Sequence, residues 1–467
     1  MSNVAVQPVS IGAAPGRGAP AVDDLDKIGY DKIRLGVLGA FAVYILCWFL
    51  QIGTRIHALG AIRIEFVMAV ILVGLAMITP RQKPEVKSNL FAYVAWYYFA
   101  LLISLPISQD FDNSWMIFID RVVKFSFMAF FIVVFVRTPF ALRVFLGAFL
   151  LACFKLGQEG LVGTITGSMI WENQGVMRLN GPTPLYAHPN SFSGMALGTL
   201  PFIYYLFPLV NKWGKAFLAV LLGFSINIII HAGSRTTYIG FIVLCALFLL
   251  RSKQKFKFLL VGAVVALIAV PLIPEQYVER FESIGGQEKE GHSKEKRIVI
   301  VQDALVIFSE HPFGVGIAAF PHVRIARFGR YQDTHNLYLE IATNLGIQGL
   351  IIWLLMILAI FRNMWRLSAG LDRQLSALQA RAPPDLAKDA PLAKHIADVK
   401  LMRAVVSAVG AYLVIRLAVG FFGHDTYEIY WWVVLGLVVA VHNLSQVAAR
   451  ITRYYAADPP KAATASA

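Results

Sequence analysis

The stretch HNLYLEIATNLGIQGLIIWLLMILAIF, residues 335–361, decides the fold because its last fifteen residues are apolar or uncharged. Residues 347–361 approach the run of about 20 apolar residues that crosses a bilayer as a helix. Of the 467 residues in the chain, 57% are hydrophobic and only 15% are charged, which is too apolar for a soluble globular surface. We therefore predict an all-α, polytopic bundle of transmembrane helices.

Apolar runs of similar length recur along the chain and predict about twelve spans. The two runs on either side of Ser234 are short and nearly continuous, so they are the least distinct pair. The predicted spans are 35–53, 62–79, 89–107, 115–136, 139–156, 190–208, 216–231, 236–250, 256–273, 347–361, 402–421 and 428–444.

Lysine and arginine concentrate in the short loops on one side of the predicted membrane. With an even number of spans these loops share a side with both termini, and the positive-inside tendency makes that side cytoplasmic. The formal net charge of +14 mostly reflects this bias. We therefore expect the lipid bilayer as a partner and no nucleic acid.

Two long loops, 157–189 and 274–346, are predicted on the side opposite the termini. In the second loop, the segment from Ile298 has the apolar spacing of an amphipathic helix, and Pro312 ends it. The predicted organisation begins with a disordered cytoplasmic tail at 1–34 and nine spans within 35–273. The large loop at 274–346 follows, then three spans within 347–446, which include a cytoplasmic loop at 362–401, and a cytoplasmic tail at 447–467.

Arg235 lies in the turn between two apolar runs, at the outer membrane surface. An arginine there is expensive unless an anion pairs with it. A guanidinium matches the geometry of a phosphate, and the preceding glycine and Ser234 offer backbone donors beside it. Arg178 precedes a Pro-rich turn on the same side, and two such arginines suggest a diphosphate clamp. The alternative for Arg235 is a structural salt bridge to Asp120 or Glu428.

His335 and Asn336 open the quoted stretch. Asp333 or Thr334 is predicted to cap a short amphipathic helix that Gly346 ends, which places His335 in its first turn. There the helix dipole disfavours imidazolium, so the neutral ring can accept a proton. A lone histidine is more often a capping or packing residue, but with two arginines on the same side we favour a catalytic base.

Other polar residues near the outer side are predicted to bind the substrate. Asp120 and Lys124 are spaced to pair on one helix face and can line a groove, with mutual neutralisation as an equal alternative. Arg416, in the eleventh span, can line the same cavity opposite Asp425 or Glu428. For the turn before the sixth span, an ordinary helix cap is the alternative. The further candidates are Ser234, Asn336, Asn180, Tyr186, His188, Asn190 and Arg297.

Four motifs occur in a fixed order: RLNGPTPLYAHPN from Arg178, GSRTTYIGF at 233–241, EHPFGVGIAAF at 310–320, and HNLYLEIATNLGIQGLI from His335. Together they resemble the O-antigen ligase and polymerase superfamily of bacterial envelope glycosyltransferases, which is similar to the GT-C class. The resemblance implies a bacterial inner-membrane enzyme with a periplasmic active site. It also implies an undecaprenyl diphosphate-linked glycan as donor, and lipid A-core or another glycan as acceptor.

The same resemblance implies roles for three residues. Arg235 and Arg178 would hold the diphosphate leaving group, and His335 would be the general base that deprotonates the acceptor hydroxyl. It further implies inversion at the anomeric centre and catalysis without a metal or other cofactor. A preorganised pair of arginines can stabilise the charge that develops on a leaving diphosphate, so this implied mechanism is physically consistent.

Three alternatives stay open. A polymerase, which extends a chain on the next lipid-linked repeat, needs the same clamp and base; the large outer loop slightly favours a ligase, whereas its basic residues suit an acidic exopolysaccharide. A transporter of polyprenyl-linked glycans would place charged residues at the midplane of several spans. The carboxylates of Asp110 and Asp112, in the first outer loop, can bind a divalent cation.

Overall fold

The computed structural model describes residues 29–80, 84–173, 176–252, 293–388, 390–423 and 426–457, together with short pieces between 254 and 278. Three sequence predictions lie outside these residues: the disordered tail up to residue 28, most of the span at 256–273, and Asp425 as a partner of Arg416.

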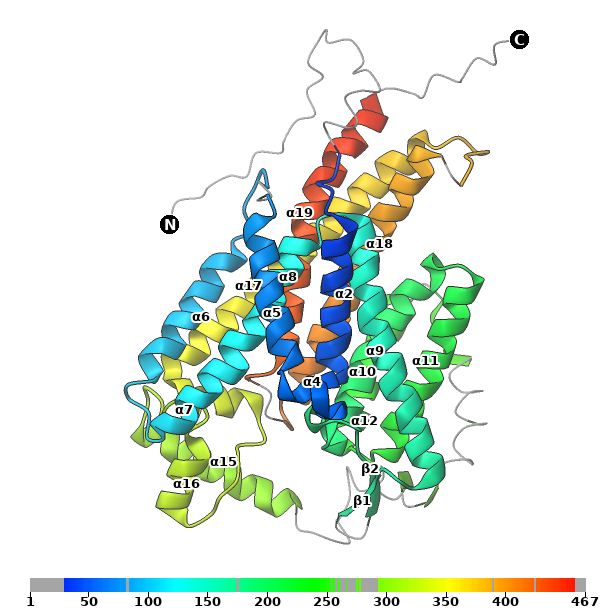
Figure 1. The fold of residues 1–467 in the computed structure, drawn as a ribbon. Helices are drawn as coiled ribbons and strands as arrows, with labels where there is room; N and C mark the ends of the chain where they lie inside the picture. Colours follow the sequence, from blue (N-terminus) through cyan, green and yellow to red (C-terminus); the bar gives the residue numbers. More distant parts are fainter. Residues whose placement is uncertain are drawn as a thin grey trace, which may run out of the picture.

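The described chain is almost entirely helical (Figure 1). Within the described residues, three shorter apolar helices are α2 (Leu35–Leu50), α5 (Ile64–Ile78) and α6 (Leu90–Ser104). The predicted all-α, multi-pass membrane fold is confirmed in this form, while the count of twelve spans is not confirmed. The six described helices that are long and apolar enough to cross a membrane are α9 (Pro139–Thr166), α10 (Pro189–Leu206), α11 (Lys212–His231), α17 (Leu337–Arg381), α18 (Pro391–Val419) and α19 (Ile429–Ala457).

Smaller elements complete the fold. One continuous helical segment consists of α7 (Phe111–Ile117), a π-helical stretch η1 (Phe118–Val123) and α8 (Lys124–Phe135). A two-stranded antiparallel hairpin, which hydropathy did not predict, pairs β1 (Ile170–Asn173) with β2 (Val176–Leu179). The others are α3 (Ile52–Arg55), α4 (His57–Ala61), η2 (Pro184–Tyr186), η3 (Phe207–Leu209), α12 (Arg235–Arg251), α15 (Ser293–Glu310) and α16 (Phe320–Phe328).

Several helices extend well beyond the apolar runs that predicted them. Helix α9 continues to Thr166, so the loop predicted to start at residue 157 begins about three turns later. Helices α17 and α18 reach Arg381 and start at Pro391, so the predicted loop at 362–401 is mostly helical, and α19 continues into the predicted tail to Ala457. Hydropathy detects only the bilayer-crossing part of a helix, whereas backbone hydrogen bonds continue the helix into polar sequence.

The bundle has two distinct ends (Figure 1). The hairpin, α15, α16 and α7 lie at one end, which we call the hairpin end. The start of α2, the end of α19 and the turn between α17 and α18 lie at the other end, which we call the termini end. The described parts of the two predicted loops that contain the hairpin, α15 and α16 therefore lie at the same end.

Close helix packing brings α10, α12 and α18 together near the hairpin end. Gly240 of α12 allows this approach, because a Cβ atom there would lie 2.6 Å from Leu197 and 2.7 Å from Val419. Elsewhere in the interior, Trp353 of α17 packs edge-on against Trp431 of α19, with ring centroids 5.5 Å apart. These contacts fix the helices whose ends carry the candidate site.

The helices α15 and α16 form a small subdomain with its own core of Ala304, Ile307, Val315, Ala319 and Phe320. The predicted helix is present as α15, which ends just before His311 and Pro312. Its apolar residues do not share one face, because Ala304 and Ile307 are buried whereas Leu305 is exposed.

Three arginines of this subdomain form ion pairs within it. Asp303, which is buried, pairs with Arg324 at 2.9 Å and with Arg330 at 3.0 Å. Arg327 pairs with Glu310 at 2.9 Å. Arg324, Arg327 and Arg330 are therefore all engaged in ion pairs within the subdomain.

The segment EHPFGVG attaches the subdomain to the bundle. Gly346 has φ 71° and ψ −175°, a conformation open only to glycine, and this breaks α17 after its first nine residues. The break lies against Phe313, whose backbone carbon would be 2.3 Å from a Cβ at Gly346. The predicted end of the short helix at Gly346 is thus confirmed, although the chain continues at once into the long apolar part of α17.

Candidate active site

Arg178 of β2 is held against the turn that joins α11 to α12. Its guanidinium donates through Nε to the Ala232 carbonyl oxygen at 2.9 Å and through a terminal nitrogen to Asn190 Oδ1 at 2.7 Å. The side chain is only 5% exposed. Because these two bonds come from two different helices, they hold the plane of the guanidinium in one orientation.

The turn itself places Arg235 next to this arrangement. Gly233 has φ 55°, which allows the sharp reversal, and Ser234 caps α12 by accepting a hydrogen bond from the Thr237 amide at 3.3 Å. Arg235 is the first residue of α12 and is half-buried. Arg178 therefore contacts a carbonyl three residues before Arg235, in the same turn.

The start of α10 supports Arg178 from the other side. His188 caps this helix, because its Nδ1 accepts from the Asn190 amide at 3.1 Å. The alternative that this turn only caps a helix is therefore correct for the His188 side chain. It is wrong for Asn190, whose side chain binds Arg178 instead. Tyr186 is fully buried, and its carbonyl oxygen accepts from the Gly181 amide at 2.8 Å.

Two further side chains lie close to Arg178. The Tyr277 hydroxyl donates to the carbonyl oxygen next to Arg178 in the chain, that of Met177, at 2.9 Å. Burial raises the pKa of Tyr277, and the positive charge of Arg178 opposes that rise. His231 packs its ring against Tyr277, and its Nδ1 bonds the Asn227 carbonyl at 2.9 Å.

Asn180, another candidate, has its backbone amide bonded to the Met169 carbonyl at 2.9 Å, which closes the end of the hairpin. Its side-chain oxygen is buried and accepts no hydrogen bond from the described residues.

His335 lies one position before the N-cap of α17, and not in the first helical turn as predicted. Asn336 is the N-cap, and its Oδ1 accepts from the amides of Tyr338 and Leu339 at 3.0 and 3.1 Å. His335 has φ 48°, which is uncommon for any residue other than glycine and strains the backbone. The sequence pattern did not distinguish Thr334 from Asn336 as the cap, because both residue types cap helices well.

The imidazole of His335 is half-buried, and its Nε2 lies 3.1 Å from the Gln332 amide nitrogen. An amide NH₂ can only donate, so this contact fits a ring that carries its proton on Nδ1. In that form the lone pair of the ring is on Nε2, so an acceptor hydroxyl would have to replace the Gln332 amide there for His335 to act as a base.

The start of α17 is attached to the end of α18. The Leu337 amide donates to the Gly420 carbonyl at 2.7 Å, and the Tyr338 hydroxyl donates to the Leu417 carbonyl at 2.7 Å. Asn336 Nδ2 adds a bond to the Phe421 carbonyl at 3.2 Å. The position of His335 therefore depends on the last turn of α18.

Arg416 connects this region with the Arg178 region. It lies one turn before Gly420 on α18, and its guanidinium carbon is 5.1 Å from the centre of the Tyr430 ring. On α10, a Cβ at Gly194 would be 3.7 Å from the Arg416 guanidinium, and Gly194 is one helical turn after Asn190. The same face of α10 thus contacts Arg178 and Arg416.

Two acidic residues near the site form ion pairs with basic residues of η1 and α8. Glu428 accepts from Arg121 at 2.7 Å, although it was predicted as a partner of Arg235 or Arg416. Asp120 pairs with Lys124 on the surface of η1 and α8, as the alternative of mutual neutralisation predicted.

Glu340 was not predicted from the sequence as a site residue. It is buried in the first turn of α17, and its carboxylate accepts from the Thr426 amide at 3.2 Å and hydroxyl at 2.7 Å. A charged residue on the otherwise apolar face of that helix is the signal that could have revealed it.

The remaining candidates lie farther along the hairpin end. Arg297 is a half-buried residue of α15. Asp110 caps α7 through the Asn113 amide at 3.4 Å, while Asp112 is exposed in the first turn of that helix. Among the described residues, no three His, Cys, Asp or Glu side chains gather in a way that would hold a metal ion.

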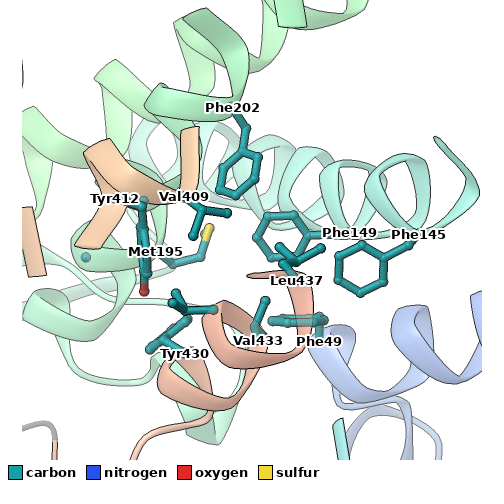
Figure 2. Close-up of a pocket in the computed structure, with 13 residues that line it drawn as sticks. Phe49, Phe145, Phe149, Met195, Phe202, Val409, Tyr412, Tyr430, Val433 and Leu437 are labelled. Carbon is teal, nitrogen blue, oxygen red and sulfur yellow. The ribbon is translucent and has the colours of Figure 1, made fainter. Parts of the chain in front are cut away.

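The interior beside Arg416 is closely packed (Figure 2). Tyr412 and Tyr430 border a cavity of about 30 Å³ that is otherwise lined by apolar side chains such as Phe149 and Phe202. A space of this size admits one or two water molecules and no larger group. Aromatic and aliphatic side chains therefore fill the interior around this cavity.

Residues 218–354 match the family described as O-antigen ligase. This segment, which is less than a third of the chain, is similar to the O-antigen ligase/polymerase superfamily. The match includes the turn with Ser234 and Arg235, Arg297 on α15, and the His335–Asn336 pair, whereas Arg178 and Arg416 lie outside it. No curated protein matches the chain. The superfamily suggests a membrane glycosyltransferase that acts on lipid-linked glycans.

Proposed function

We propose that the chain is an O-antigen ligase-type glycosyltransferase. It would move a glycan from undecaprenyl diphosphate to a hydroxyl of lipid A-core. The observation that carries this proposal is the bond from Arg178 to the Ala232 carbonyl, which brings a second arginine to the turn that contains Arg235.

The arginines would stabilise the leaving group. Breaking the bond between sugar and diphosphate leaves negative charge on the diphosphate, and fixed guanidinium groups in a partly buried site lower the energy of that charge. Arg178 is buried and oriented by two protein bonds, while Arg235 is half-buried at the helix N-terminus, where the dipole adds positive potential. Arg416, which shares a face of α10 with Arg178, would extend this positive region.

His335 would remove the proton from the acceptor hydroxyl as that oxygen attacks the sugar. Its support is the contact with Gln332, which fits a neutral ring, and the strained backbone at φ 48°. Such strain persists where the surrounding structure holds it, and it clusters at functional sites. The bonds of Asn336 and Leu337 to the end of α18 supply that surrounding structure.

The orientation in the membrane follows from the charge pattern. We infer that the termini end is cytoplasmic and the hairpin end periplasmic, since the short loops rich in lysine and arginine fall on the side of the termini. A periplasmic site fits a donor whose glycan has already crossed the membrane.

The ligase proposal is favoured over a polymerase. Basic residues of the large loop were the sequence argument for a polymerase that handles an acidic polymer. Arg324, Arg327 and Arg330 are engaged in ion pairs with Asp303 and Glu310, so this argument loses much of its weight.

A polyprenyl-glycan transporter is disfavoured by the packed interior beside Arg416, where the cavity measures about 30 Å³. The candidate residues instead gather at one end of the bundle, as a transferase at the membrane surface requires.

The test is transfer by the full chain in nanodiscs, with a polyprenyl diphosphate-linked glycan as donor. Lipid A-core and a second lipid-linked repeat would be offered in separate reactions, each with and without EDTA. Arg235→Ala and His335→Ala would be compared with Arg327→Ala and His322→Ala, which change the same residue types at exposed positions of α16.

We expect transfer to lipid A-core that survives EDTA, is lost in the two site variants and persists in the two controls. Transfer only to the lipid-linked repeat would establish a polymerase instead. Full activity of the His335→Ala variant would exclude His335 as the base. Loss of activity in EDTA would support the alternative that Asp110 and Asp112 bind a divalent cation.

A further inference from the structure

A second cavity, which has a polar lining, lies at the termini end, between the start of α6, the extended part of α17, and α19. Its volume is about 360 Å³, far larger than the apolar cavity beside Arg416. The residues that matter for its chemistry are Lys87, Ser88, Arg366, Gly370 and Gln374, which all line it. It contains none of the residues of the candidate active site.

The charge of this cavity is positive. Lys87 and Arg366 line it, and no acidic residue does. Glu85, close to Lys87 in the chain, pairs with Arg450 at 3.5 Å, and Asp372 of α17 pairs with Arg403 at 2.7 Å. The acids on the same two segments are therefore engaged elsewhere, which leaves a net positive lining.

The cavity also offers uncharged hydrogen-bonding groups. The N-terminus of α6 opens into it through Ser88 and Asn89, where helix amides and the dipole favour an anion. Gln374 Oε1 is buried and accepts no hydrogen bond from the described residues. Two cations, a helix N-terminus and one acceptor oxygen match a phosphate ester that carries a hydroxyl group.

The depth of the cavity favours a lipid as the source of that phosphate. Arg366 follows the break at Gly346 by twenty residues, which is about 30 Å along a helix and equals the thickness of the hydrocarbon layer. The neighbouring Trp365 is 73% exposed, as is typical of tryptophan at the membrane interface. The cavity thus lies at the level of the lipid headgroups.

We propose that this cavity binds the phosphoglycerol headgroup of an anionic phospholipid. Lys87 and Arg366 would contact the phosphate, and Gln374 would accept a hydrogen bond from a glycerol hydroxyl. Since the cavity is at the end opposite His335, this binding would anchor α6 and α17 to the membrane and take no part in glycan transfer.

The experiment measures the thermal unfolding midpoint of the full chain, stripped of lipid in a non-ionic detergent. It would be titrated with short-chain phosphatidylglycerol, short-chain phosphatidylcholine, or inorganic phosphate. Lys87→Gln with Arg366→Gln removes the two cations. Gly370→Phe fills the cavity and keeps its charges, because a Cβ at Gly370 meets no atom within 4 Å. Arg381→Gln with Lys388→Gln is the control with the same change in net charge at exposed positions outside the cavity.

We expect phosphatidylglycerol to raise the midpoint of the wild type and of the charge control, with little effect from phosphatidylcholine. Each lost charge-assisted bond should weaken apparent affinity roughly 10- to 100-fold, and Gly370→Phe should abolish the shift. Equal stabilisation by inorganic phosphate would overturn the lipid assignment. An unchanged response of both site variants, or no response of the wild type, would refute the site itself.

Discussion

The interaction between Arg178 and Asn190 allows a sharp test of the diphosphate clamp. Asn190→Asp is isosteric, keeps an acceptor 2.7 Å from the guanidinium, and adds a negative charge in the first turn of α10, where the helix dipole favours it. If Arg178 serves only the fold, this variant should be as stable and as active as the wild type.

If Arg178 holds the leaving diphosphate, the same variant should fold but transfer poorly. At an effective dielectric constant of about 20, two unit charges about 6 Å apart repel by about 2.8 kcal/mol, which corresponds to roughly a 100-fold loss in kcat/KM for the donor. Asn190→Ala is the companion variant: it removes an acceptor from a buried arginine, so it should lower both stability and transfer, the latter roughly 10- to 100-fold.

Both variants would be assayed in nanodiscs, with initial rates measured at several donor concentrations and unfolding midpoints measured in parallel. Asn190→Asp with a wild-type midpoint and wild-type kcat/KM would refute the role of Arg178 in binding the leaving group. A lowered kcat/KM that appears only together with a lowered midpoint would point to a structural role alone.

Three other substitutions test the architecture through the unfolding midpoint of the purified protein. Gly346→Ala should destabilise by about 1 to 3 kcal/mol or more, from strain at φ 71° and collision with the Phe313 backbone, and a midpoint equal to wild type would refute the close contact. Asp303→Asn leaves the buried Arg324 without its charge partner and should destabilise by about 3 to 5 kcal/mol; faster proteolysis between α15 and α16 would locate the effect. Glu340→Ala should cost roughly 1 to 3 kcal/mol, because it leaves the amide and hydroxyl of the loop before α19 unsatisfied, and an unchanged midpoint would contradict that bond.

Much of the candidate site was readable in the sequence because its residue types are out of place in their surroundings. Arg235 follows an apolar run and a Gly-Ser turn, and His335 precedes an apolar run. Each residue could therefore be selected as a candidate without knowledge of its contacts. Gly346 was predicted to end a helix, and the structure shows it at φ 71°. The predicted pair of Asp120 and Lys124 is also present, since helical spacing alone brings them together.

Other features depend on contacts between distant segments, which hydropathy does not encode. Glu428 pairs with Arg121, more than 300 residues away, and the sequence did not predict this partner. The cap of the α17 helix also could not be chosen by residue type, because Asn336 is held in place by its bond to Phe421 in the turn after α18.

The sequence by itself determined that this is an all-α membrane protein with its polar chemistry in a few segments between apolar helices. The reason is that apolar runs and charges near them act locally, within one helix and its flanks. Only the tertiary structure decided that Arg178 meets the turn before Arg235, that Arg416 shares α10 with it, and that a hairpin carries the first of these arginines. Those positions follow from packing between α10, α11 and α18, and such packing depends on side-chain shape across the whole bundle.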